Sequence, residues 1–175
     1  MNALKKDLNR AELEGSSLSI IMADLDHFKE INDRWGHLAG DAVIRFVSEK
    51  MNASIRVSDS AGRYGGEEFM VVLPSCEVEM AQAKAERLRI SIENGAIDFL
   101  AKKDSDDVLR VTASFGVASS TNKHRLDSES LVREADLALY RAKQNGRNRV
   151  EIAPDFKVEE IKKQYLPEDD GIANN

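Results

Sequence analysis

The hydrophobic positions of this chain follow two kinds of pattern. Apolar residues recur every three or four positions in five segments, which predicts amphipathic helices over residues 4–14, 28–35, 40–51, 81–92 and 127–144. Short apolar or alternating runs predict strands over residues 18–23, 69–73, 108–118 and 150–152. Gly65 and Gly66 lie between strand-like flanks, so a hairpin is expected there, and Pro74 ends its second strand.

The order of these elements indicates the fold class. Gly36 and the Asn145-Gly146 pair are typical helix ends, and Asp127 or Ser128 is a typical helix start. From residue 18 onward the elements run β-α-α-β-β-α-β-α-β, with the hairpin in the middle. This order resembles a split βαβ, ferredoxin-like arrangement, which is an α+β fold with helices packed on a mostly antiparallel sheet.

We expect one domain over residues 1–153 and a polar tail over residues 154–175. The polar run of residues 102–107 predicts a surface loop. Phe115 and Tyr140 fall on apolar stripes, so both are expected in the core.

Composition narrows the class of protein. The chain has 175 residues, 42% hydrophobic and 32% charged, which excludes a disordered chain or a disulfide scaffold. Its 25 basic and 31 acidic residues give a net charge of −6, so general binding to nucleic acid or to an anionic membrane is not expected. The lone Cys76 suits a reducing compartment, and no apolar run approaches the roughly 20 residues of a membrane helix. The expected location is the cytoplasm.

Two acidic clusters stand at unusual places. Asp24 directly follows a buried strand, and Glu67 and Glu68 directly follow the hairpin glycines. If the first strand and the hairpin are neighbours in the sheet, these carboxylates converge, and a hard cation such as Mg²⁺ would offset their repulsion. The alternative is a strand-end cap at Asp24 and an ordinary exposed hairpin.

Four blocks of sequence surround these clusters. The first holds residues 24–29 (DLDHFK), 31–33 (IND), 36–37 (GH) and 40–41 (GD). The others are residues 63–69 (RYGGEEF), 135–143 (ADLALYRAK) and 146–148 (GRN). In order and register they closely resemble the diguanylate cyclase (GGDEF) domain family, in its GGEEF variant, from about Leu18 to Val150.

This resemblance implies a palm-like nucleotide-cyclase fold and a reaction. In the family, two GTP molecules on two facing domains condense to cyclic di-GMP with release of two pyrophosphates, so a homodimer is implied. Asp24, Glu67 and the backbone carbonyl of Leu25 would hold Mg²⁺, or Mn²⁺ in its place. Glu67 would also accept the proton of the attacking hydroxyl, and Glu68 would be the adjacent essential acid.

The resemblance also implies the substrate contacts. Asn32 and Asp41 match the residues that read guanine, while Lys29, Lys143 and Arg147 match those that hold the triphosphate. On the sequence alone, the alternative for Asp41 is a helix N-cap, and both roles can hold at once. Without the resemblance, Lys143 and Arg147 are more simply cations that complement a helix C-terminus.

Arg56, Asp59 and Arg87 match a product site of the family. Arg56 and Asp59 form its RxxD motif, in which the arginine and the aspartate grip cyclic di-GMP and inhibit the enzyme, and Arg87 matches an arginine from the partner domain. The alternative is an exposed ion pair between positions i and i+3.

The chain departs from the family pattern at its start, because the DxLTGLxNR segment before the first helix is absent. This predicts an excised catalytic domain or a short member, whose parent is free to carry a sensory or membrane-anchored region upstream. Two alternatives to a cyclase are a catalytically silent module that senses GTP or cyclic di-GMP, and a structural dimerisation and relay unit. The intact set of acids favours the cyclase.

Overall fold

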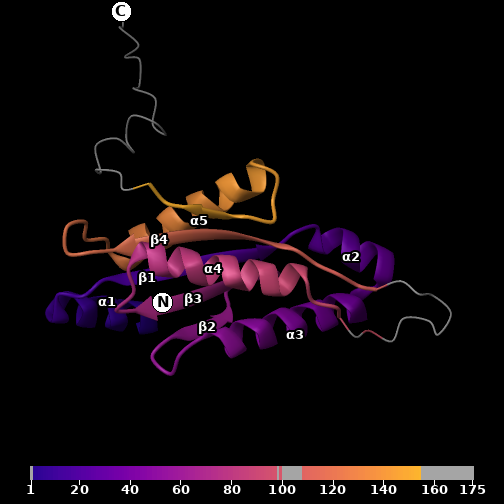
Figure 1. Ribbon diagram of the computed structural model, residues 1–175, viewed down its shortest axis with the longest axis horizontal. Coiled ribbons are helices and arrows are strands. Elements are labelled where there is room, and N and C mark those ends of the chain that lie inside the picture. Colours follow the sequence, from indigo (N-terminus) through magenta and orange to yellow (C-terminus); the bar gives the residue numbers. More distant parts are fainter. Residues whose placement is uncertain (1, 98, 100–107, 155–175) are drawn as a thin grey trace, which may run out of the picture.

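A computed structural model describes residues 2–97, 99 and 108–154 (Figure 1). The helices in this part of the chain are α1 (Asn2–Glu14), α2 (Phe28–Trp35), α3 (His37–Ser54), α4 (Val78–Glu93) and α5 (Ser128–Gln144). The strands are β1 (Leu18–Leu25), β2 (Ser60–Arg63), β3 (Glu68–Pro74), β4 (Ala113–Ser120) and β5 (Val150–Ile152). The predicted order of elements and the α+β class are confirmed. The loop predicted over residues 102–107 and the tail from residue 155 lie outside the described residues.

One sheet with the strand order β2-β3-β1-β4-β5 organises the molecule. β1 pairs antiparallel with both β3 and β4, and only the β4–β5 pair is parallel. In the β1–β3 ladder Asp24 stands opposite Glu68. The end of the first strand therefore lies beside the bend of the hairpin, as the sequence predicted.

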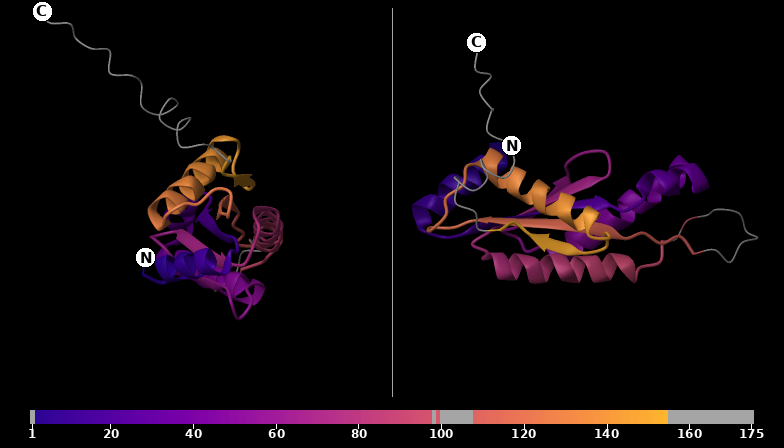
Figure 2. Two further views of the ribbon diagram at one scale, coloured as in Figure 1. Left: turned by 90° about the vertical axis from the view of Figure 1, so that its left-hand side faces the viewer. Right: turned by 90° about the horizontal axis from the view of Figure 1, so that it is seen from above.

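Helices cover both faces of the sheet. As a result, the central strand β1 is buried on both sides along its whole length. Ile21, Ala23 and Leu25 pack toward α3 and α4, and Leu18, Ile20 and Met22 pack toward α1 and α5. Figure 2 shows α4 and α5 on opposite sides of the sheet. Since side chains alternate along a strand, Asp24 faces the α5 side.

Helix α5 lies directly against β4. A Cβ at Gly116 would stand 2.1 Å from the carbonyl oxygen of Ala135 and 2.3 Å from the backbone nitrogen of Leu139. The helix backbone approaches the strand this closely only because Gly116 has no side chain. This contact holds the middle of α5 against β4.

Three details differ from the prediction. α3 begins at His37 and not at residue 40, because Gly36 reverses the chain at a φ of 83° and allows two helices to follow each other without a loop. β4 begins at Ala113 and not at residue 108, and Leu109 makes only an isolated bridge to Ile97.

The third difference is Tyr140, which is 58% exposed, so its expected place in the core was wrong. It lies one position after the buried Leu139 and therefore on another face of α5, and its hydroxyl accepts a hydrogen bond from Gln144. Phe115 is fully buried, as predicted. Within the described ranges, no helix combines the length and apolarity that a membrane crossing requires.

Candidate active site

Three carboxylates surround one small cavity at the end of β1. Asp24, Glu67 and Glu68 line a space of about 250 Å³ together with Gly66. The backbone N–H of Leu25 donates to the carbonyl oxygen of Glu67 at 3.3 Å, which ties the hairpin bend to the strand end. The convergence of the two acidic clusters predicted from the sequence is therefore present. A larger cavity of about 600 Å³, between α2 and residues 108–112, contains none of these three acids.

The surroundings of these carboxylates disfavour negative charge. Burial raises the pKa of Asp24, although Lys143 and Arg147 oppose the shift. Burial also raises the pKa of Glu67, and the nearby charge of Asp24 raises it further. Two adjacent carboxylates of this kind ionise together more readily when a cation lies between them.

The donor set fits a hard divalent cation. Among residues 2–97, 99 and 108–154, no group of three or more His, Cys, Asp or Glu side chains is arranged to hold a metal ion. Asp24 and Glu67 supply two carboxylates, and the backbone carbonyl of Leu25 adjoins them in sequence. Mg²⁺ is held in proteins by one or two carboxylates, with water and phosphate oxygens completing its shell, so two carboxylates and a carbonyl are sufficient.

The hairpin glycines have different roles. Nothing lies within 4 Å of the place where a Cβ of Gly66 would stand, so a ligand can approach the backbone there. A Cβ at Gly65 would instead meet the carboxylate oxygen of Glu68 at 2.4 Å. Arg63 braces the bend, because its Nε donates to the carbonyl oxygens of Gly65 and Gly66 at 3.1 and 2.9 Å. No function of Arg63 was predicted from the sequence.

Two basic residues reach the acidic cavity from α5 and the turn after it. The ammonium of Lys143 lies 2.8 Å from an oxygen of Asp24. The charge of Arg147 also acts on Asp24, which places this guanidinium near the cavity. Lys143 does lie in the last turn of its helix, as the alternative interpretation required, but its partner is a carboxylate of the candidate site.

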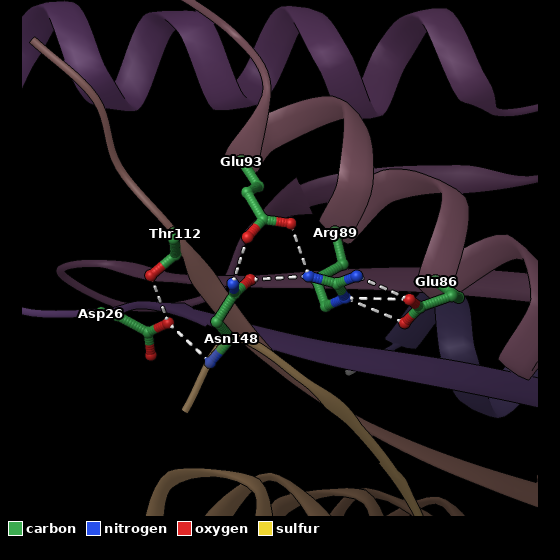
Figure 3. Close-up of polar contacts among 6 residues, drawn as sticks. All are labelled: Asp26, Glu86, Arg89, Glu93, Thr112 and Asn148. Atoms are coloured by element: carbon green, nitrogen blue, oxygen red, sulfur yellow. Dashed lines mark hydrogen bonds and ion pairs between the residues drawn. The ribbon is translucent and has the colours of Figure 1, made fainter. Parts of the chain in front are cut away.

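The turn that carries Arg147 is held by a network that the sequence did not reveal. Gly146, Arg147 and Asn148 all have positive φ angles, of 110°, 62° and 44°. The backbone N–H of Asn148 donates to Asp26 at 3.0 Å, and its side chain bonds Glu93 at 2.7 Å and Arg89 at 3.0 Å (Figure 3).

The network continues at both of its ends. Arg89 forms ion pairs with Glu86 and Glu93 at 2.7 and 2.8 Å. The buried carboxylate of Asp26 also accepts hydrogen bonds from the hydroxyls of Thr112 and Ser114, each at 2.7 Å. The strand end, the turn with Arg147 and helix α4 are thus joined by side chains.

The predicted guanine readers lie on two successive helices. Asn32 is on α2 and Asp41 is on α3, and the two helices meet at Gly40, where a Cβ would stand 2.1 Å from the amide oxygen of Asn32. Asp41 is exposed and lies in the second turn of α3, so its alternative interpretation as an N-cap was wrong. Lys29 is exposed on α2.

The residues of the predicted product site line one cavity elsewhere on the molecule. Arg56, Asp59 and Arg87 surround a space of about 210 Å³ between the end of α3 and helix α4. Asp59 accepts a hydrogen bond from the backbone N–H of Arg56 at 3.0 Å and forms its ion pair with Lys84. The alternative of an exposed i,i+3 ion pair therefore does not describe this motif.

Comparison with known proteins identifies the family. The sequence profile described as "Diguanylate cyclase, GGDEF domain" matches residues 1–149. The chain belongs to this family. Over 146 residues it is 44% identical to "Diguanylate cyclase A" of Treponema denticola, and over 148 residues it is 40% identical to "Diguanylate cyclase DosC" of Escherichia coli. These alignments cover 83% and 85% of the chain but only 38% and 31% of the two relatives.

Solved structures of GGDEF domains share the fold. The GGDEF domain of DgcB from Caulobacter crescentus in complex with c-di-GMP superimposes with a TM-score of 0.79 at 32% identity, covering 87% of this chain and 86% of that one. The active GGEEF domain of a diguanylate cyclase from Vibrio cholerae gives a TM-score of 0.79 at 33% identity, covering 87% and 93%. The fold class and the family expected from the sequence are both confirmed.

Proposed function

We propose that this chain is the catalytic domain of a diguanylate cyclase, which condenses two GTP molecules to cyclic di-GMP and releases two pyrophosphates. The observation that carries the proposal is the meeting of Asp24, Glu67 and Lys143 at the open backbone of Gly66. Two findings support it: the relatives are diguanylate cyclases, and a neighbour described as active has a GGEEF domain, the motif found here at residues 65–69.

Each half-reaction joins the 3′ oxygen of one GTP to the α-phosphorus of the other and breaks the bond from that phosphorus to pyrophosphate. Glu67 takes the proton of the hydroxyl, and its raised pKa makes it a better proton acceptor than an exposed glutamate. Glu68 is the adjacent acid, held close to Gly65. Asp24, Glu67 and the Leu25 carbonyl would hold a divalent cation, which would supply charge neutralisation for the phosphates and lower the pKa of the hydroxyl.

The basic residues position the triphosphate. Lys143 pairs with Asp24 and would exchange this carboxylate for a phosphate oxygen when substrate binds. Arg147 adds a second positive charge from its fixed turn, and Lys29 a third from α2. Phosphoryl transfer depends mainly on such positioning and charge neutralisation.

Guanine specificity would come from Asn32 and Asp41. A carboxylate accepts hydrogen bonds from the N1–H and N2–H₂ edge of guanine, which adenine lacks, so ATP would leave the carboxylate of Asp41 unpaired.

One domain holds one GTP, so catalysis requires a homodimer with its sites face to face. Cyclic di-GMP would inhibit by binding at the cavity of Arg56, Asp59 and Arg87.

The test is incubation of the chain at high concentration with GTP and Mg²⁺, followed by chromatographic detection of cyclic di-GMP. We expect product from the unsubstituted chain and from the control Glu79→Ala, which removes an exposed glutamate of α4, and none from Glu67→Ala. Absence of product from the unsubstituted chain, even when fused to a dimeric coiled coil, would contradict the cyclase and favour a silent sensor.

A further inference from the structure

One buried carboxylate beside the candidate active site has no part in the proposed reaction. Asp26 is the first residue after β1, one position beyond Leu25, and it is only 4% exposed. A carboxylate is buried at this depth at a large cost in free energy unless hydrogen bonds satisfy its oxygens. The groups that donate to Asp26 therefore indicate what this residue does.

Three donors from two other parts of the chain satisfy Asp26. One of its oxygens accepts the hydroxyl of Ser114 at 2.7 Å. The other oxygen accepts both the hydroxyl of Thr112 at 2.7 Å and the backbone N–H of Asn148 at 3.0 Å (Figure 3). The backbone N–H of Asp26 also donates to the carbonyl oxygen of Thr112 at 2.9 Å. Asp26 thus joins the end of β1, the start of β4 and the turn after α5.

The bond to Asn148 is important because the preceding residue is Arg147. Arg147 has a φ of 62°, and a residue other than glycine keeps such a conformation only where its surroundings hold it. The N–H of Arg147 bonds the carbonyl oxygen of Ala142 on α5 at 2.9 Å, and the N–H of Asn148 bonds Asp26. Both peptide groups that flank Arg147 are therefore anchored, one to α5 and the other to Asp26.

Asp26 connects the two halves of the candidate site. Its two preceding neighbours, Asp24 and Leu25, supply proposed metal ligands, and its hydrogen-bond partner Asn148 directly follows the proposed phosphate ligand Arg147. The charge of Arg147 acts on Asp24, so the two halves lie near each other. A movement of the turn relative to the strand end would displace the guanidinium from the cation, and a displacement of about 1 Å can cost about a hundredfold in rate.

We propose that Asp26 is a positioning residue for triphosphate binding: its carboxylate holds the turn of residues 146–148 so that Arg147 faces the cavity of Asp24 and Glu67. Asp26 acts through the turn and not by contact with substrate. Because Arg147 is held in advance, less ordering is left to occur when the triphosphate binds. This inference rests on the proposed function, in which Arg147 holds the triphosphate, and it assigns Asp26 to phosphate affinity and not to guanine recognition.

The experiment is calorimetric titration of 3′-deoxy-GTP, with Mg²⁺ present, into the 175-residue chain and its variants. This compound lacks the attacking hydroxyl, so it binds without turnover. Asp26→Asn leaves one acceptor atom for three donors and should weaken binding about tenfold or more. The matched control Asp7→Asn removes an equal charge from a half-exposed position of α1 and should bind as the unsubstituted chain does. Unchanged affinity in Asp26→Asn overturns the inference.

A double-mutant cycle tests whether Asp26 acts through Arg147. Arg147→Ala should itself weaken the binding of 3′-deoxy-GTP, and adding Asp26→Asn should then cause little further loss. Additive losses would mean that Asp26 supports the site by another route, which overturns the positioning role.

A ligand without phosphates separates positioning of Arg147 from general damage to the site. 3′-Deoxyguanosine, titrated by NMR, should bind Asp26→Asn and the unsubstituted chain equally, because Asn32 and Asp41 lie on other elements. Equal weakening of 3′-deoxyguanosine and 3′-deoxy-GTP would contradict a role confined to the triphosphate.

Thr112→Val takes the place of Asp26→Asn if the latter does not fold. It removes the hydroxyl that shares a carboxylate oxygen with the N–H of Asn148, and it leaves every residue of the turn unchanged. We expect binding of 3′-deoxy-GTP to weaken about threefold or more, and this loss should disappear in the Arg147→Ala background. Affinity unchanged by Thr112→Val would then overturn the inference.

These titrations do not depend on turnover, so they separate the inference from the proposed function. If the chain produces cyclic di-GMP but Arg147→Ala binds 3′-deoxy-GTP as tightly as the unsubstituted chain, the cyclase stands and the inference fails. If no cyclic di-GMP is formed, even by the coiled-coil fusion, while Asp26→Asn and Arg147→Ala weaken binding as expected, the inference stands and the cyclase fails.

Discussion

Gly40 controls the position of Asn32 at the scale of single residues. A Cβ on Gly40 would stand 2.1 Å from the amide oxygen of Asn32 and 3.1 Å from the ring of Phe28. In an ordinary helix, alanine in place of glycine is stabilising by about 1 kcal/mol. Here the added methyl group must push the Asn32 amide away from its present position. The need to keep Asn32 in place therefore explains why a glycine stands at position 40.

Gly40→Ala should therefore impair GTP binding. We expect KM for GTP to rise about tenfold or more, because small displacements of a positioning group have large kinetic effects. The measurement is steady-state production of cyclic di-GMP. Gly62→Ala is the matched control, since nothing lies within 4 Å of its added Cβ, and its KM should not change. An unchanged KM in Gly40→Ala would show that Asn32 does not read the base.

Asp59 should make folding stability depend on pH. Burial alone would raise the pKa of this carboxyl, but the Arg56 N–H and Lys84 outweigh it and hold the pKa below its ordinary value of 3.8. A carboxyl with a lowered pKa in the folded state stabilises the fold above its unfolded pKa, and this contribution is lost as the pH falls through the folded pKa.

Asp59→Asn should thus lower the free energy of unfolding at neutral pH by on the order of 3 kcal/mol, the cost of breaking a buried ion pair. The difference from the unsubstituted chain should shrink on acidification below about pH 4. Urea denaturation of both proteins at neutral pH and below about pH 4 measures this difference in the free energy of unfolding. A difference of the same size at both would show that the ion pair with Lys84 does not stabilise the fold.

The acids of the site were predictable from the sequence because their signal is local: Asp24 ends an apolar run and Glu67 follows two glycines. Lys84 was not, since its partner is 25 positions away. The partners of Asp26 are still more distant, with Thr112 86 positions away and Asn148 122. A pattern of residue types does not show which distant charges the fold brings together.

At the scale of elements, the turn between α5 and β5 carries strain that other elements hold in place. Arg147 and Asn148 both adopt left-handed backbone conformations, which cost of order 1 kcal/mol or more for residues other than glycine. The side chain of Asn148 is held by Glu93 and Arg89 on α4, and its N–H by Asp26 at the end of β1. This arrangement keeps Arg147 beside the acidic cavity.

Asn148→Ala should release this turn. It removes the bonds to α4 and leaves a Cβ residue at a φ of 44°, so we expect a loss of roughly 1–3 kcal/mol in stability and a higher KM for GTP. Asn148→Gly removes the same bonds but relieves the backbone strain, and it should retain more of the stability. Thermal denaturation and GTP kinetics on both variants are the measurements. A KM equal to that of the unsubstituted chain in Asn148→Ala would contradict the role of the turn.

The helices and strands themselves were predicted well, because most carry a clear period of apolar positions. The errors are in the starts of α3 and β4, where the local sequence pattern did not decide the boundary. Gly36 does end α2, but the next helix was expected from residue 40, and the positive φ of Gly36 lets α3 begin at His37. The alternating residues before Ala113 suggested a longer strand, yet hydrogen bonding to a neighbouring strand, which sequence periodicity does not report, begins only there.

At the scale of the whole molecule, the described residues bring Asp24, Glu67 and Glu68 together at a single cavity, with Lys143 beside Asp24. The proposed reaction needs two GTP molecules that attack each other, so a single copy of this domain is incomplete. The chain spans about a third of the length of its curated relatives, 38% and 31% of the two compared.

Specific activity should consequently rise with protein concentration. Initial rates per mole of chain across a dilution series test this, with sedimentation velocity reporting the fraction of dimer. Fusion to a dimeric coiled coil should remove the dependence. Constant specific activity at dilutions where the chain sediments as a monomer would contradict catalysis between two domains.

The chain's one cysteine lies in the wall of the cavity between the RxxD turn and α4. Cys76 is 7% exposed, and burial raises the pKa of its thiol, so alkylating reagents reach a reactive thiolate only when the structure around it opens. The rate at which Cys76 is alkylated therefore measures how often the structure around this side chain opens. The protein carries a native chemical probe of that motion, and no label needs to be engineered into it.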